Sequence, residues 1–124
     1  MVKKIALVDD SVILRTAIKN VLESFRFDVV LEAGNSAELF KGLEERAVDL
    51  VLLDVFFPSE NGLDILARLK KRYPKIKVLM VTGLRQETIL NEAQRLGADG
   101  VLYKPFDTNE LLASVQRLCG EIPH

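Results

Sequence analysis

Short apolar runs alternate along this chain with longer stretches in which apolar residues recur every three or four positions. The runs are brief, rich in β-branched residues and mostly continuous, and they cover residues 5–8, 29–31, 50–53, 78–81 and 101–103. Such runs predict strands that are covered on both faces, as in a parallel sheet between layers of helices. Because Glu32 follows the second run directly, we expect that strand to lie at an edge of the sheet.

The stretches between the runs have the period of amphipathic helices, and the first two carry apolar stripes. Ser11 is placed to cap the first helix, and Ser36 opens the second. The expected inner face of the first helix is Ile13, Leu14, Ala17, Ile18, Val21, Leu22 and Phe25, and that of the second is Ala37, Phe40, Leu43 and Ala47. These faces should pack against the sheet.

The other three predicted helices also carry apolar residues at helical spacing, and their ends are marked in the sequence. Gly62 precedes the third helix and Pro74 stops it, while Gly97 closes the fourth in a C′ position. Asp107 and Glu110 have the spacing of a capping box at the start of the fifth. Strict alternation of strands and helices indicates an α/β fold with a doubly wound parallel sheet. Since no repeats or linkers interrupt it, residues 1–124 are expected to form a single domain.

Polar residues follow the predicted strands at the points where the strands end. They are Asp9, Asp10, Asp54, Thr82, Lys104 and, less obviously, the loop residue Thr108. The carboxyl ends of parallel strands meet at one edge of a sheet, so the first five can share one small volume. Periodicity alone leaves a Rossmann-like and a flavodoxin-like strand order open. Only the flavodoxin-like (βα)5 order 2-1-3-4-5 brings Asp10, Asp54 and Lys104 together with Thr82, and we therefore expect that order.

Charge and composition narrow the classes of function. The formal net charge is −1, which gives no bulk electrostatic attraction to nucleic acid. No stretch approaches the roughly 20 apolar residues of a membrane span, and the apolar run behind the basic N-terminus is too short for a signal peptide. The one cysteine, Cys119, has no partner for an internal disulfide, consistent with a reducing compartment. We expect a cytoplasmic protein that binds neither a membrane nor nucleic acid directly.

The five strand-end residues have the chemistry of a phosphoryl and metal site. Asp54 ends the most hydrophobic run, and both burial and the like charges of Asp9 and Asp10 would raise its pKa. A hard cation that prefers oxygen ligands resolves this conflict, and so few carboxylates favour Mg²⁺ over a dedicated Ca²⁺ cage. Lys104 offers a countercharge and three donors, and Thr82 a small hydroxyl. Asp54 is then the natural nucleophile, since carboxylates can form acyl phosphates.

Pro105 directly follows Lys104. A cis peptide bond between them would turn the chain sharply and direct Lys104 back over the strand ends. Trans is the commoner isomer before proline, so the sequence leaves both open.

Several segments carry motifs of a known family in the family's order, from one end of the chain to the other. They are Val8-Asp9-Asp10-Ser11, Leu53-Asp54-Val55-Phe56-Phe57-Pro58 with Asn61-Gly62, Val81-Thr82-Gly83, Leu96-Gly97-Ala98 and Lys104-Pro105-Phe106. Each alone is a weak signal, but together and in register they are specific. The chain resembles a response-regulator receiver domain of two-component systems, and is similar to the stand-alone members that act in chemotaxis.

The resemblance implies a role for each residue of the site. Asp54 would accept a phosphoryl group from a sensor histidine kinase or a phosphotransfer protein. Mg²⁺ would be bound by Asp10, by Asp9 directly or through water, by Asp54 and by the backbone carbonyl of Phe56. Thr82 and Lys104 would contact the phosphoryl group. Phosphorylation would then shift the population between two conformations.

The resemblance also implies what the protein would act on. It would be a phosphoacceptor signalling module rather than an enzyme, although it would promote its own phosphorylation and dephosphorylation with Mg²⁺. The downstream target would be a protein that docks on the fourth helix, fifth strand and fifth helix. A homodimer through the same face is an open alternative. The kinase and the target are not specified by the sequence.

The chain departs from the family pattern at three positions. Val101 stands three residues before the lysine, where the family usually has an aromatic switch residue. Tyr103, on the same strand face, is a surrogate switch, part of a partner-binding surface or a packing residue. Phe56 and Leu84 occupy the places at which the family tunes the lifetime of the phosphoryl group. Because both are apolar, we expect slow hydrolysis, unless Phe56 only packs over its loop and leaves water access unchanged.

Three other classes of function compete with this interpretation. A phosphatase of the haloacid-dehalogenase type would need an acid at position 56, where the chain has Phe56. A flavodoxin-like cofactor binder would need a phosphate-binding loop after the first strand, where Asp9 and Asp10 would repel phosphate. The serious alternative is a receiver-like scaffold that binds a protein partner without phosphorylation, which the change at Val101 keeps open.

Overall fold

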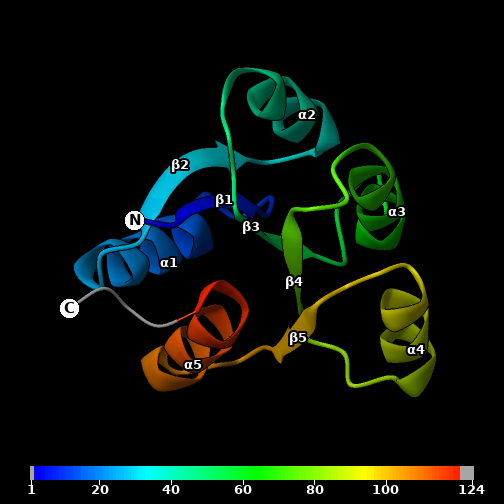
Figure 1. The fold of residues 1–124 in the computed structure, drawn as a ribbon. Helices are drawn as coiled ribbons and strands as arrows, with labels where there is room; N and C mark the ends of the chain where they lie inside the picture. Colours follow the sequence, from blue (N-terminus) through cyan, green and yellow to red (C-terminus); the bar gives the residue numbers. More distant parts are fainter. Residues whose placement is uncertain (1, 121–124) are drawn as a thin grey trace.

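The strands form one parallel sheet, and the helices lie on its two faces (Figure 1). The computed structural model describes residues 2–120. The elements in chain order are β1 (Lys4–Val8), α1 (Val12–Ser24), β2 (Asp28–Ala33), α2 (Ser36–Glu45), β3 (Leu50–Asp54), α3 (Gly62–Arg72), β4 (Lys77–Thr82), α4 (Glu87–Arg95), β5 (Gly100–Tyr103) and α5 (Thr108–Cys119).

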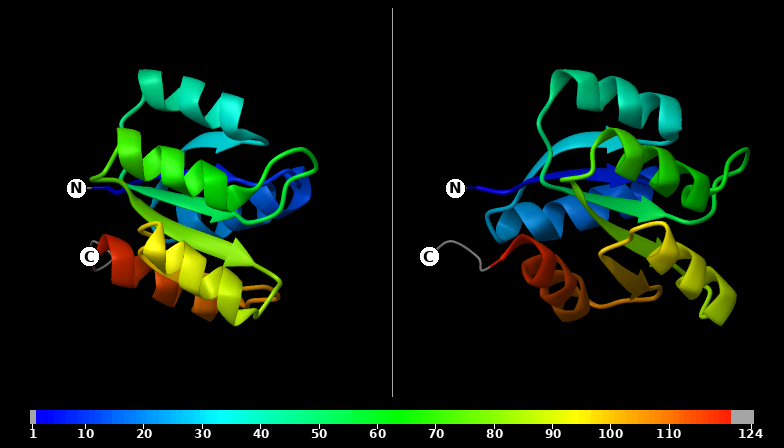
Figure 2. Two further views of the ribbon diagram at one scale, coloured as in Figure 1. Left: turned by 90° about the vertical axis from the view of Figure 1, so that its right-hand side faces the viewer. Right: turned by 45° about the vertical axis from the view of Figure 1, so that its right-hand side comes forward.

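The strand order is β2-β1-β3-β4-β5, and every neighbouring pair is parallel. This confirms the flavodoxin-like order and excludes the Rossmann-like one. The second apolar run belongs to β2, which lies at an edge as expected, although the strand continues through Glu32 to Ala33. The views in Figures 1 and 2 show α1 and α5 on one face of the sheet and α2, α3 and α4 on the other.

The central strand β3 is buried along its whole length, which explains its continuous apolar run. Successive side chains point to opposite faces of a strand, and here each face has its own core. Val51 and Leu53 pack into the cluster beneath α2, α3 and α4. Leu50 and Leu52 pack into the cluster beneath α1 and α5. The last residue of this doubly covered strand is Asp54, so the fold places a carboxylate at the rim of the core.

The predicted helix ends are confirmed at most positions. The Ser11 side chain accepts a hydrogen bond from the Leu14 amide at the start of α1. Asp107 and Glu110 form a capping box at the start of α5. Gly97 follows α4 with a φ of 97°, in the left-handed region that favours glycine. These local signals fix where α1 and α5 begin and where α4 ends.

The expected inner face of α2 is wrong at two positions. Ala37 is exposed, and Ala47 is exposed and lies beyond the end of the helix. The buried face is instead Ser36, Leu39, Phe40, Gly42 and Leu43. Gly42 explains the shift, because a Cβ at this position would collide with the Leu31 side chain of β2. The helix therefore packs on the sheet through Gly42, which a prediction based on apolar residues alone does not include.

The expected inner face of α1 is too wide. Of the predicted stripe only Ile18 and Leu22 are fully buried. Ile13 is 85% exposed and Phe25 is 39% exposed, while Ala17 is also exposed. The sheet and α5 cover a narrower strip of α1 than its apolar positions offer, so an apolar surface remains open along this helix.

Cys119, the last residue of α5, is half-buried. Burial raises the pKa of its thiol to about 11, so it is protonated at neutral pH. A protonated, half-buried thiol packs as a small hydrophobic group.

Candidate functional site

The carboxyl ends of β1, β3, β4 and β5 meet at one edge of the sheet and bring five polar residues together. Asp54 and Thr82 are the last residues of β3 and β4. Asp9 and Asp10 follow β1, and Lys104 follows β5, where its amide donates to the Thr82 carbonyl at 2.8 Å. The sequence-predicted cluster is therefore present.

Thr108, the sixth strand-end residue of the sequence, lies elsewhere. It is the first residue of α5 and lines a groove between that helix and α1.

Three carboxylates face one another at the centre of the site. Asp9, Asp10 and Asp54 each offer an oxygen within 4.8 Å of the others. Asp9 and Asp54 are only 6% and 7% exposed, whereas Asp10 is open to solvent. The Lys104 ammonium lies between the two buried acids and donates to Asp9 Oδ2 and Asp54 Oδ2, at 3.2 Å in each case. Such a set of hard oxygens has the chemistry to hold a metal ion that prefers oxygen ligands.

Burial and charge act in opposite directions on the ionisable groups of this site. Burial raises the pKa of Asp54, the nearby Lys104 lowers it, and the like charge of Asp9 raises it again, so that the net shift is upward. For Lys104, burial lowers the pKa, but the charges of Asp54 and Asp9 outweigh it and the net shift is upward. The lysine is therefore held charged, while ionisation of Asp54 is less favourable than that of an ordinary aspartate.

The same tight turn occurs after three of the strands. In each, the strand-end side chain accepts a hydrogen bond from the backbone amide two residues further along the chain. Ser11 donates to Asp9 Oδ1 at 2.8 Å, Phe56 to Asp54 Oδ1 at 3.4 Å, and Leu84 to Thr82 Oγ1 at 3.1 Å; all three are backbone N–H donors. These turns hold the oxygens of the site at the edge of the sheet.

The loop after Asp54 is pressed tightly against the end of β3. The Gly62 amide donates to the Val55 carbonyl at 2.6 Å. A Cβ on Gly62 would overlap the backbone carbonyl of Asp54, so only glycine fits at this first position of α3. Phe56 forms a bridge with Asn61 across the loop, and its side chain is 50% exposed.

Arg15 was not singled out by the sequence reasoning but belongs to this site. It lies in α1 and lines a small cavity together with Asp9 and Asp54. Its guanidinium donates to the backbone carbonyl of Asp9 and forms an ion pair with Glu32 at 3.4 Å. The signal available in the sequence was an arginine directly beside the apolar stripe of α1, three residues before the buried Ile18.

Glu60 is a second residue that the sequence reasoning missed. Its carboxylate accepts hydrogen bonds from the backbone amide of Ser36, at 2.8 Å, and from the Ser36 hydroxyl. These bonds hold the pKa of Glu60 below its usual value. The loop that follows Asp54 is thereby tied to the start of α2.

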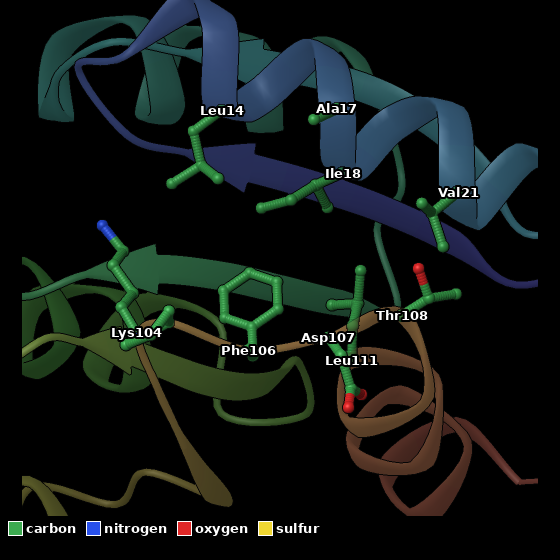
Figure 3. A pocket seen from close by; sticks show the side chains of 10 residues that line it. Leu14, Ala17, Ile18, Val21, Lys104, Phe106, Asp107, Thr108 and Leu111 are labelled. Atoms are coloured by element: carbon green, nitrogen blue, oxygen red, sulfur yellow. The ribbon is translucent and has the colours of Figure 1, made fainter.

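An apolar groove of about 330 Å³ opens beside the site, between α1 and the start of α5 (Figure 3). The peptide bond between Lys104 and Pro105, at one end of the groove, is cis. Leu14, Ala17, Ile18 and Val21 of α1 face Phe106 and Leu111 across the groove, and Lys104 marks the end that opens toward the site. The groove is the open part of the α1 stripe described above.

The fold and the arrangement of these residues define the class of the protein. Residues 5–116 match the family model of the response regulator receiver domain, and the chain belongs to this family. In the part of the chain that the structure describes, no helix is long and apolar enough to cross a membrane.

The relatives include proteins of about the same length and longer ones. Chemotaxis protein CheY of Listeria monocytogenes is 34% identical over 114 residues, which are 92% of this chain and 96% of that protein. The transcriptional regulatory protein CrdR of Helicobacter pylori is 35% identical over 124 residues, which are 99% of this chain but 58% of that protein. A response regulator from Thermotoga maritima superposes with a TM-score of 0.88 at 30% identity, covering 98% of this chain and 100% of that one.

Proposed function

We propose that the protein is a phosphorylation-activated response regulator in a two-component phosphorelay. Asp54 accepts a phosphoryl group from a histidine kinase or phosphotransfer protein, with Mg²⁺ held by Asp9, Asp10, Asp54 and the backbone carbonyl of Phe56. We place this switch in the cytoplasm. The observation that carries the proposal is the Lys104 ammonium, shared at 3.2 Å between the two buried carboxylates of a receiver fold.

The chemistry follows from the positions of the side chains. A carboxylate oxygen of Asp54 attacks the phosphorus atom, the new P–O bond forms, and the donor's P–N bond breaks with its electron pair left on the imidazole nitrogen. Mg²⁺, when bound, offsets the negative charge that gathers at the carboxylates and the phosphoryl oxygens. Lys104 already contacts Asp54 and can donate to a phosphoryl oxygen while it keeps its bond to Asp9.

Thr82 supports the other side of the phosphoryl group. Its side-chain oxygen accepts the Leu84 amide, which leaves the hydroxyl hydrogen free to donate. A donation from Thr82 to the phosphoryl group would draw along the loop that follows it, because Leu84 is tied to the same oxygen. This is the conformational shift that we propose as the signal.

The phosphodonor protein must cover the rim of the site to bring its phosphorylated side chain to Asp54. The rim is apolar: Val12 is 62% exposed, Ile13 85%, Phe56 50% and Leu84 40%. The groove in Figure 3 continues this surface between α1 and α5. We propose that an apolar helix face of the donor packs here.

The output surface is proposed from the family resemblance. A downstream protein would dock on α4, β5 and α5, and a homodimer through that face is the alternative. Tyr103 is half-buried at the end of β5, with the Arg85 guanidinium 4.3 Å from the centre of its ring. This pair links the Thr82 loop to the proposed output surface.

A scaffold that acts without phosphorylation is the second candidate. Val101, at the place of the usual aromatic switch, is half-buried and packs against the core instead of standing ready to swing inward. In this alternative the site would be retained while the partner recognises one fixed conformation.

Intact-mass spectrometry after incubation with acetyl phosphate, with and without Mg²⁺, separates the two candidates. The control is Asp54→Asn, which keeps the side-chain oxygen that accepts the Phe56 amide. A Mg²⁺-dependent phosphoryl adduct that the control lacks supports the switch. A folded wild-type protein that forms no adduct overturns it in favour of the scaffold.

A further inference from the structure

Arg15 is the one charged side chain of α1 that points inward beneath the site rather than into solvent; its side chain is only 14% exposed. Its guanidinium joins the ends of two neighbouring strands. On one side it donates to the Asp9 carbonyl, directly after β1, and on the other it pairs with Glu32 of β2 at 3.4 Å. Lys19 also contacts Glu32, at 3.8 Å, so the glutamate that pairs with Arg15 is itself held in position.

Asp9 has a partner for every one of its polar atoms. Its amide donates to the Ala33 carbonyl at 3.0 Å, Oδ1 accepts the Ser11 amide at 2.8 Å, and Oδ2 accepts Lys104 at 3.2 Å. Arg15 supplies the fourth bond, to the backbone carbonyl. Because this carbonyl lies inside the turn that orients the carboxylate, its position decides where the carboxylate points.

We infer that Arg15 is a positioning residue for the proposed divalent-cation site, and that it acts through the backbone of Asp9. The guanidinium holds the end of β1 against β2, so that the Asp9 carboxylate stays within reach of Asp10 and Asp54. This inference rests on the proposed function, since it assumes that these carboxylates bind Mg²⁺.

The direction in which loss of Arg15 changes the affinity for Mg²⁺ separates a positioning role from a purely electrostatic one. Arg15 lies close to Asp9 and Asp54, with which it lines a small cavity, so its positive charge repels a divalent cation bound by these carboxylates. Removal of that charge alone would tighten Mg²⁺ binding. Loss of a group that orients a metal ligand weakens binding instead, typically by about 10- to 100-fold. The two explanations therefore predict changes in opposite directions.

The experiment is a Mg²⁺ titration of the folded protein, followed through the backbone amide signals of Ser11 and Phe56 by NMR. In Arg15→Met, which removes the charge and all donors, we expect a dissociation constant about tenfold higher than in the wild type. Arg15→Lys, which loses the two-sided contact but keeps the repelling charge, should bind Mg²⁺ no more tightly than Arg15→Met. The matched control is Arg46→Met, which removes the same charge from an exposed arginine beyond the end of α2.

A second measurement does not depend on the metal. Hydrogen exchange of the Ser11 amide reports its bond to Asp9 Oδ1, and it should be faster in Arg15→Met than in Arg46→Met. If Arg15→Met does not fold, Arg15→Lys carries the test, because it keeps the positive charge and loses the two-sided contact. An unchanged or lower dissociation constant in the Arg15 variants overturns the inference. A wild type that binds no Mg²⁺ overturns the proposed metal site itself, which is a different result.

Discussion

The two halves of the site are held in different ways. On the β1–β3 side, Asp9 and Asp54 are buried and bonded to backbone amides, and Lys104 joins them. On the β4–β5 side, Thr82 is 2% exposed, but every residue of the loop that follows it, up to the start of α4, is exposed. That loop is tied back by the bond from the Leu84 amide to Thr82 and by the Arg85 guanidinium over the Tyr103 ring.

This difference separates a fixed part of the site from a movable one. Hydrogen bonds to charged groups contribute about 1.5–3 kcal/mol each, and a group left buried without its partner is costly. A cation–π contact at an exposed position contributes only about 0.5–1 kcal/mol. The β1–β3 side is therefore suited to holding a cation at one place, and the β4–β5 side to changing conformation at small cost.

Two glycines close to strand ends give the most direct contrast. In Gly62→Ala the new Cβ would overlap the Asp54 carbonyl, so we expect the free energy of unfolding to fall by about 3 kcal/mol. In Gly83→Ala the Cβ meets no atom within 4 Å, and we expect a change within about 0.5 kcal/mol. Urea denaturation of both variants measures the difference. Equal losses would show that the two halves are equally rigid.

Lys104→Met leaves two buried carboxylates without their shared cation. Breaking a fully buried ion pair costs about 3–5 kcal/mol, and because the Lys104 side chain is 29% exposed we expect about 2 kcal/mol at pH 7. The loss should shrink toward pH 4 as Asp54, whose pKa is raised, becomes protonated. Mg²⁺ should restore part of the stability at pH 7. Lys19→Met, which removes a lysine that is 38% exposed, is the control and should change the free energy of unfolding by less than about 0.5 kcal/mol.

Phe56 and Leu84 are exposed apolar residues on opposite halves of the site. Both should slow the attack of water on the phosphoryl group. We expect Phe56→Asn to shorten the lifetime of phosphorylated Asp54 by roughly tenfold, because a polar group there can orient the attacking water. Phe56→Leu, which stays apolar, should keep the long lifetime. The decay of the phosphoryl adduct, followed by mass spectrometry, tests both. A wild-type decay as fast as that of Phe56→Asn would rule out this role for Phe56.

The upward shift of the Asp54 pKa predicts that Asp54→Asn increases the free energy of unfolding by an amount that depends on pH. A carboxyl group whose pKa is higher in the folded than in the unfolded state stabilises the fold below its unfolded pKa, and this contribution is lost as pH rises through the folded value. At pH 7 without Mg²⁺ the wild type therefore carries an unfavourable ionised group that the variant lacks. We expect the variant to be the more stable at pH 7, with the gap closing toward pH 4. Urea denaturation across this range would contradict the prediction if the gap were constant.

The smallest effect should come from the movable half. Arg85→Gln removes the contact with Tyr103, and we expect the free energy of unfolding to fall by about 0.5 kcal/mol or less. The NMR signals of residues 83–86 should shift, because the loop loses this tether to β5. Tyr103→Leu should give the same pattern. Signal changes that reached Asp9 and Ser11 would mean that the halves are not independent.

The positions of the main site residues could be predicted because they depend on two general rules. Short apolar runs mark strands, and the carboxyl ends of parallel strands meet at one edge, which is enough to group Asp54 with Thr82 and Lys104. Arg15 could not be found in this way, since its role depends on α1 lying over the junction between β1 and β2. The prediction of the buried face of α2 was wrong for a similar reason. This face depends on the close approach of Gly42 to Leu31, and these residues belong to different elements.

The thiol of Cys119 has a practical consequence for labelling experiments. With a pKa of about 11, only about one molecule in ten thousand carries the thiolate at pH 7, and the side chain is half-buried as well. A cysteine introduced at an exposed position such as Leu84 would react with maleimide dyes or spin labels far faster than the native one. Reporter groups can thus be attached at Phe56 or Leu84 in a protein that retains Cys119.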